Sequence, residues 1–218
     1  MYNKDSIFWT SLLDWFSHGS RSYPWRKTYN PYHVLLAEFL LQQTHVRKVE
    51  SVYHNILNTY PTLGHIAVAE INSLVKFFEP IGLLYRSTRL RDTAEIIVSD
   101  YGANVPDTYK ELISLPGIGD YIANAVLCYA YDQNTVPVDT NVIRLFSRYF
   151  GFASDKARPR TDKKLALNIA SVFPESIEYR KANLAILDYA GLVCTARNPV
   201  CVSCCFSNYC TYKKTLTE

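Results

Sequence analysis

Four of the six cysteines lie close together near the C-terminal end of the chain: Cys194, Cys201, Cys204 and Cys210. Thiolates are soft ligands that bind zinc or the iron of an iron-sulfur cluster. The gaps of six, two and five residues match neither the common zinc-finger spacing nor the ferredoxin spacing. The residues alone therefore predict a four-thiolate metal centre, with zinc and a 4Fe-4S cluster equally open. Either metal would stabilise a tail that has little core of its own.

Asp139 comes just before an apolar-periodic segment that Gly151 closes, so its ordinary role is to cap a helix. A capping carboxylate is held as an anion by N–H donors and by the helix dipole. Such a group is a fixed negative charge, and it can stabilise positive charge that develops during a reaction. Asp139 is therefore a candidate catalytic residue as well as a cap.

Glu38 lies inside the apolar run from Val34 to Leu41. The ordinary explanation is an exposed or salt-bridged glutamate, but no lysine lies within a helical turn of it. A partly buried carboxyl holds its proton more tightly than it does in water, as a proton donor must. Glu38 is the second candidate catalytic carboxylate.

The segment Leu115-Pro116-Gly117-Ile118-Gly119 separates two expected helices. Its glycines allow a tight turn and a close approach to a ligand, and the following helix start offers free N–H groups that suit a phosphate. An ordinary turn between helices is the alternative. The stretch from residue 144 to 164 carries seven basic side chains, which fit either a solvated surface or a strip facing phosphates. They are Arg144, Arg148, Lys156, Arg158, Arg160, Lys163 and Lys164.

Helices must position these groups, because apolar residues recur at helical spacing and no long alternating pattern appears. The periodicity marks a first helix around Trp9 and Phe16, and Asn30-Pro31 opens a helix that we expect to run through Val46. Further helices are expected over about 49–60, 70–78, 86–100 and 107–114, and after Asp120. The fold class is therefore all-α.

The 218 residues, 48% hydrophobic and 20% charged, describe a globular chain, and the net charge of +3 permits nucleic-acid binding without requiring it. Asp5 and Asp14 interrupt the N-terminal apolar stretch, so we expect neither a signal peptide nor a membrane partner. We expect a cytoplasmic, nucleoid-associated protein. In that reducing compartment the cysteines are thiols rather than disulfides.

Taken together, the Pro-Gly-Ile-Gly turn, Asp139 about twenty residues later and the four-cysteine loop resemble the endonuclease III superfamily of DNA glycosylases. The resemblance runs from Pro24-Trp25-Arg26 through Cys210. It implies two α-helical lobes with a DNA-binding cleft between them. One lobe is a six-helix barrel with a helix-hairpin-helix over residues 27–135, and residues 1–26 and 136–218 form the other, which carries an iron-sulfur cluster.

The same resemblance implies roles for individual residues. Asp139 would be catalytic, Gly117 and Gly119 would grip DNA phosphates, and the four cysteines would hold a 4Fe-4S cluster. Bifunctional members carry a lysine after Gly-Ile-Gly-Asp that forms a Schiff base, whereas this chain has Tyr121 there and no lysine between Lys110 and Lys156. We therefore expect a monofunctional glycosylase without efficient strand cleavage, with Glu38 and Tyr121 completing the catalytic site.

Two branches of the superfamily fit. Gln42-Gln43 resembles the adenine glycosylases, which act on adenine opposite guanine or 8-oxoguanine. Two features favour the mismatch-specific thymine-DNA glycosylases. The chain ends soon after Cys210, and its segment Ile81-Gly82-Leu83-Leu84-Tyr85 departs from the Gly-Leu-Gly-Tyr-Tyr of the adenine branch. Thr140 replaces the residue expected in either branch. We expect removal of thymine or uracil opposite guanine, with adenine removal as the alternative.

The partner is then double-stranded DNA with a mismatched base, bound by a monomer. Gln42 and Gln43 would fill the gap or contact the orphan base, and Leu83 would be a wedge between bases. Phosphate contacts are expected from Arg144, Arg148 and Arg197. A further alternative from another class is a non-catalytic, cluster-stabilised DNA-binding module or a redox sensor.

Overall fold

The computed structural model describes residues 3–215, and this part of the chain contains helices and turns but no β-strand. The all-α expectation is confirmed. No helix among these residues has both the length and the apolar character needed to cross a bilayer. The chain divides into two compact units: Ser22–Pro137, here the central unit, and the described parts of Met1–Arg21 and Val138–Glu218, here the terminal unit. The expected lobe over residues 27–135 lies within the central unit, and residues 1–2 and 216–218 of the other lobe lie outside the described residues.

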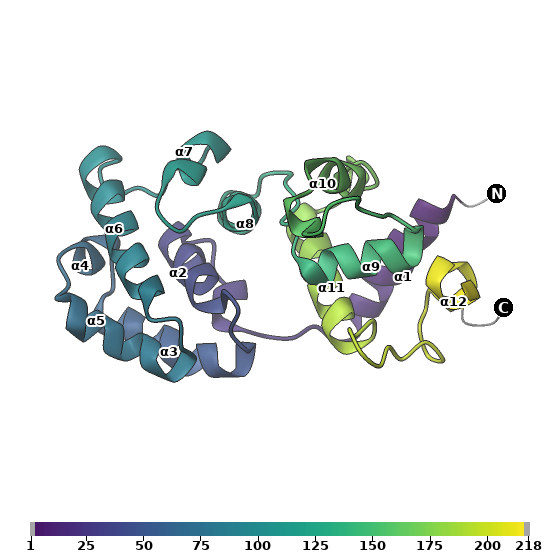
Figure 1. Cartoon of the computed structure of the whole chain (residues 1–218), viewed down its shortest axis with the longest axis horizontal. Helices are drawn as coiled ribbons and strands as arrows, with labels where there is room; N and C mark the ends of the chain where they lie inside the picture. The colour runs from purple at the N-terminus through teal and green to yellow at the C-terminus, as the bar shows by residue number, and fades with distance from the viewer. Residues whose placement is uncertain (1–2, 216–218) are drawn as a thin grey trace. The chain divides into compact units, whose positions relative to one another are not determined.

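The central unit is built around α2 (Pro31–Leu41), which is apolar on nearly all sides and buried along most of its length. The Asn30 side chain caps it by accepting hydrogen bonds from the N–H groups of Tyr32 and His33, and Pro31 occupies the first helical position. α2 packs against α3, α6 and α8 (Figure 1). The other helices of the unit are α3 (Val46–Thr59), α4 (Leu63–Ala67), α5 (Ile71–Phe78), α6 (Tyr85–Asp100), α7 (Tyr109–Ser114) and α8 (Asp120–Tyr131).

The expected helix from Pro31 through Val46 is wrong in its second part. α2 ends at Leu41, and α3 begins at Val46 after a four-residue turn. Gln43 adopts a positive φ of 52°, a conformation that few residues other than glycine adopt. The turn contains neither glycine nor proline, and its local stabilisation comes from Thr44, which donates to the Gln42 carbonyl, and from His45, whose side chain caps α3.

The terminal unit combines both ends of the chain. Its helices are α1 (Lys4–Ser17), α9 (Thr140–Phe150), α10 (Lys163–Ala170), α11 (Tyr179–Leu192) and α12 (Thr211–Thr215). Phe8 of α1 lies at the centre of an aromatic core, with its ring centroid 4.9 Å from that of Phe206 and 5.3 Å from that of Phe146. The Trp9 indole N–H donates to the Val172 carbonyl at 2.6 Å. These contacts fasten the N-terminal helix to the C-terminal half of the chain.

Candidate functional site

Asp139 is the N-cap of α9 in the terminal unit, as expected. Its Oδ1 accepts hydrogen bonds from the backbone N–H groups of Asn141 and Val142, both at 2.8 Å, and its Oδ2 accepts one from the Asn141 side-chain amide at 2.7 Å. Both carboxylate oxygens are thus held in one orientation, while the residue stays half-buried rather than sealed. This geometry is suited to a fixed negative charge.

Asn141 is itself held from the other side by Arg144. The guanidinium of Arg144 donates to Asn141 Oδ1 at 3.0 Å, to the Ala190 carbonyl at 2.8 Å and to the Cys194 carbonyl at 2.9 Å. Burial lowers the pKa of Arg144 from its usual value, against the opposing influence of Cys194 and Asp139 nearby. A chain of hydrogen bonds therefore runs from the Asp139 carboxylate to the first cysteine of the loop.

Arg148 also serves the cysteine loop. Its guanidinium donates to the carbonyls of Thr195 at 2.7 Å and Ala196 at 2.9 Å, and lies 3.5 Å from the Cys194 sulfur. Arg144 and Arg148 are both half-buried and hold this loop, which is an internal role that the sequence interpretation missed; their phosphate contacts stay a prediction. In contrast, Arg197 and the five basic residues from Lys156 to Lys164 are exposed.

The four loop cysteines are half-buried free thiols. The Tyr189 hydroxyl donates to the Cys204 sulfur at 3.0 Å, and the Cys210 thiol lies 3.3 Å from the Arg148 carbonyl. Burial raises the pKa of Cys210, against hydrogen bonds from the backbone N–H groups of Lys213 and Tyr212, which lower it. No group of three or more His, Cys, Asp or Glu side chains within residues 3–215 is arranged to hold a single metal ion.

Glu38 and Tyr121 belong to the central unit. Glu38 lies on α2 and is 5% exposed, so it is more deeply buried than the sequence indicates. Tyr121 is half-buried in the first turn of α8. Because α2 and α8 pack against each other, the two residues are placed by the same helix pair.

The Pro-Gly-Ile-Gly turn precedes α8 as expected. Gly117 has φ of 79°, and a Cβ on it would lie 3.0 Å from the Phe39 ring and 3.1 Å from the Arg89 side chain, so only glycine fits without displacement. Its carbonyl accepts a hydrogen bond from the Gln42 side chain at 3.2 Å. Gly119 is exposed and caps α8 without a side-chain hydrogen bond. The start of a helix carries partial positive charge, which favours an anion.

Two of the expected base-contacting residues are exposed and strained. Gln43 has φ of 52° and Leu83 has φ of 54°. Leu83, Leu84 and Tyr85 form an apolar surface run with exposed fractions of 37%, 44% and 46%. Gln42, in contrast, is half-buried and contacts the Gly117 carbonyl, so Gln43 is the glutamine that the structure presents to solvent.

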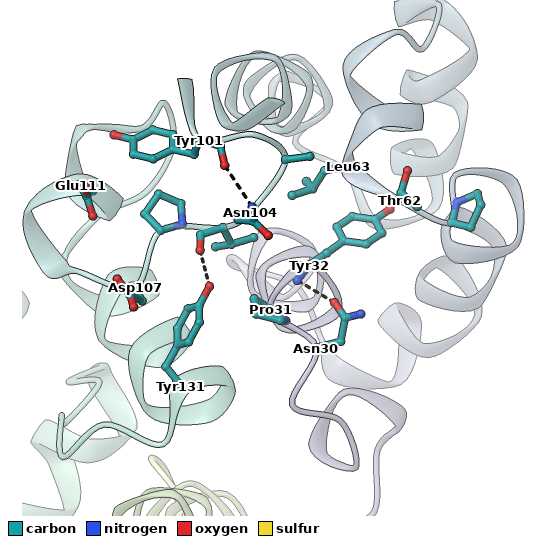
Figure 2. A pocket seen from close by; sticks show the side chains of 14 residues that line it. Asn30, Pro31, Tyr32, Thr62, Leu63, Tyr101, Asn104, Asp107, Glu111 and Tyr131 are labelled. Atoms are coloured by element: carbon teal, nitrogen blue, oxygen red, sulfur yellow. Dashed lines mark hydrogen bonds between the residues drawn. The ribbon is translucent and has the colours of Figure 1, made fainter. Parts of the chain in front are cut away.

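The central unit also contains a cavity of about 690 Å³ that none of the expected site residues line (Figure 2). Tyr32 enters it from the start of α2 and Tyr131 from the end of α8, where its hydroxyl donates to the Val105 carbonyl. Gln42 follows the other end of α2, ten residues from Tyr32 and about 15 Å away at 1.5 Å per helical residue. The cavity is therefore separate from the Gln42–Gln43 turn.

Sequence reasoning missed three supporting residues: Arg86, Asn141 and Tyr189. Arg86 is fully buried, and its spacing from Leu90, Ala94 and Ile97 places it on the buried face of α6. That periodicity is the signal that could have identified it. Tyr189 gave no such signal, because its hydroxyl reaches the cysteine loop through tertiary packing. Asn141 contacts Asp139 and Arg144, two and three residues away, so its position beside the expected cap is the signal that could have identified it.

Comparison with known proteins agrees with the resemblance seen in the sequence. Residues 36–170 match the HhH-GPD superfamily of base excision DNA repair proteins. A thymine-DNA glycosylase of Aeropyrum pernix is 35% identical over 92% of each chain, and an adenine DNA glycosylase of Mycobacterium tuberculosis is 33% identical over 89% of this chain and 64% of its own. The solved structure of a thermostable thymine-DNA glycosylase superposes with a TM-score of 0.90 at 30% identity, covering 97% of both chains.

Proposed function

Because the chain belongs to the HhH-GPD superfamily of base excision DNA repair proteins, we propose that it is a monofunctional DNA glycosylase that removes mispaired thymine or uracil opposite guanine. The observation that carries the chemical part of this proposal is the Asp139 carboxylate, fixed at the start of α9 by three hydrogen bonds. The similarity to thymine-DNA glycosylases over nearly the whole chain supports the choice of base.

The proposed reaction is hydrolysis of the N-glycosidic bond of an extruded nucleotide. A mispaired base is extruded more easily than a paired one, because less pairing energy is lost. As the bond to the base breaks, positive charge develops on the deoxyribose, and the Asp139 carboxylate stabilises that charge electrostatically. The carboxylate needs no reorganisation in this step, since Asn141 and Val142 already hold it in place.

Glu38 is proposed to assist the leaving base or the attacking water by proton transfer. Its burial on α2 supports this role. Tyr121, in the first turn of α8, would line the pocket that receives the extruded nucleotide and orient its sugar. It offers no amine, and so cannot form the Schiff base that precedes strand cleavage.

Double-stranded DNA is the proposed partner. The N–H groups at the start of α8 and the glycine turn before it would bind backbone phosphates. The exposed basic residues from Lys156 to Lys164, with Arg197, would add contacts that weaken with salt. Gln43 and Leu83 are proposed to enter the duplex beside the extruded nucleotide.

We propose that Cys194, Cys201, Cys204 and Cys210 hold a 4Fe-4S cluster. The donor set fits, because the Tyr189 hydroxyl and the Arg148 guanidinium each direct a donor at one of these sulfurs, which favours thiolate ligands. When bound, the cluster would supply binding free energy that orders the loop. Visible absorbance of the purified protein, with iron and sulfide in equal amounts, would distinguish this cluster from zinc.

A single-turnover panel tests the function. Duplexes containing T:G, U:G, A:G or A:8-oxoguanine are incubated with excess protein, and released base is measured. We expect excision from T:G and U:G, with little covalent trapping by borohydride. Excision confined to the adenine duplexes would assign the chain to the other branch, abundant trapping would contradict the monofunctional mechanism, and binding without any excision would favour a non-catalytic module.

A further inference from the structure

Arg86 is a fully buried arginine whose hydrogen bonds all run to main-chain carbonyls of two separate turns. Its Nη1 donates to the carbonyls of Phe39 at 3.1 Å, Leu40 at 2.8 Å and Gln42 at 2.9 Å. These groups form the C-terminal end of α2, immediately before Gln43. The guanidinium therefore satisfies carbonyls that the end of a helix would otherwise leave without partners.

The other side of the same guanidinium holds the turn before α6. Nη2 donates to the carbonyls of Ile81 at 3.3 Å and Gly82 at 2.7 Å, and Nε donates to that of Leu83 at 3.4 Å. One planar group thus joins residues that lie more than forty positions apart in the sequence. The ring of Phe78 packs beside it, 5.8 Å from the guanidinium carbon.

Both joined turns contain a residue in an unfavourable backbone conformation. Gln43 and Leu83 have φ of 52° and 54°, which side-chain-bearing residues adopt only where the surrounding structure enforces it. Arg86 stabilises both conformations, because it donates hydrogen bonds to the carbonyl of Gln42, just before Gln43, and to the carbonyl of Leu83 itself. Both strained residues are exposed, whereas Arg86 is sealed from solvent and cannot touch DNA.

We propose that Arg86 is a positioning residue that makes the Gln42–Gln43 turn and the Gly82–Leu83 turn one rigid edge, so that Gln43 and Leu83 enter the duplex together. The entry of Gln43 and Leu83 into DNA rests on the proposed function. The joining of the two turns by Arg86 does not, because its hydrogen bonds exist in the free protein. Extrusion of the nucleotide, rather than bond cleavage, is the step that Arg86 supports.

Arg86→Lys is the informative substitution. Lysine keeps the charge, but its ammonium is a point donor that lacks the forked geometry of a guanidinium, so it reaches the carbonyls of one turn and not both. Arg91→Lys on the same helix is the matched control, because the ion pairs of Arg91 run to Asp92 and Glu95 of its own helix and to neither turn. Circular dichroism and thermal melting establish that both variants fold.

The first measurement is hydrogen–deuterium exchange of the free protein. In Arg86→Lys we expect amides of residues 42–45 and 82–85 to exchange faster together, by about tenfold, while the control matches the parent protein. Faster exchange in one segment alone, or in neither, would contradict the proposal that Arg86 holds the two turns together. This result stands whether or not the protein proves to be a glycosylase.

The second measurement separates extrusion from chemistry. On a U:G duplex we expect Arg86→Lys to lower the rate of single-turnover excision about tenfold. The rise in fluorescence of a 2-aminopurine beside the target, which reports extrusion of the nucleotide, should fall in parallel. On a duplex whose uracil is already unpaired in a bulge, the loss should nearly disappear. Equal losses on both substrates would refute a role in extrusion, whereas a parent protein that excises nothing would instead defeat the proposed function.

Discussion

At the scale of single residues, Asp139 shows how the cap of a helix can hold a carboxylate in one orientation. Its Oδ1 caps α9, and the amide of Asn141 holds Oδ2, so the cap that starts the helix also aims the carboxylate. Arg144 in turn donates hydrogen bonds to the Asn141 side-chain oxygen and to the Cys194 carbonyl. The orientation of the carboxylate therefore depends on the order of the cysteine loop.

The first prediction concerns Asp139→Asn. The amide is neutral but nearly isosteric and still able to cap, so we expect the fold and mismatch binding to persist while single-turnover excision falls on the order of 10²-fold or more. Asp162→Asn is the control, because Asp162 caps α10 in the same way. Undiminished excision by Asp139→Asn, or an equal loss in the control, would remove Asp139 from the mechanism.

At the scale of elements, the glycine turn before α8 is fixed by close packing. Gly117→Ala would place a methyl group 3.0 Å from the Phe39 ring at a φ of 79°, so we expect destabilisation of about 1–3 kcal/mol and a melting temperature lower by several degrees. Gly19→Ala is the matched control, since no atom lies within 4 Å of a Cβ there. Equal melting temperatures for the two variants would contradict the packing argument.

The helices themselves were largely predictable from sequence, because their apolar periodicity and caps are local. Asn30-Pro31 and Asp139 signal their helix starts by side-chain chemistry alone. The end of α2 was not predictable in this way. Gln42-Gln43 continues a helical pattern, whereas the carbonyls at this helix end accept hydrogen bonds from Arg86, more than forty residues later in the sequence.

The same reasoning explains which parts of the candidate site the sequence identified. Residues whose type and local setting indicate chemistry, such as Asp139 and the cysteines, could be found by inspection. The internal contacts of Arg144 and Arg148 could not, because a basic side chain gives the same sequence signal whether it faces solvent or bonds carbonyls of a loop fifty residues away.

At the scale of the whole molecule, a net charge of only +3 means that affinity for DNA depends on where the cations lie. Lys163 and Lys164 are exposed at the start of α10. If each contacts a phosphate, Lys163→Gln combined with Lys164→Gln should lower the slope of log affinity against log salt by about 0.9 per contact. Lys76→Gln, exposed on α5, is the control. An unchanged slope in the double variant would exclude this strip from the interface.

The order of the chain has a consequence for biosynthesis. Residues 22–137 are continuous, so the central unit can fold as soon as they have left the ribosome. Phe8 and Trp9 precede that unit in the chain, whereas their partners Phe146, Val172 and Phe206 all follow it. While the central unit is being synthesised, the aromatic side chains of the α1 segment therefore lack the partners that bury them, which makes that segment a target for a chaperone.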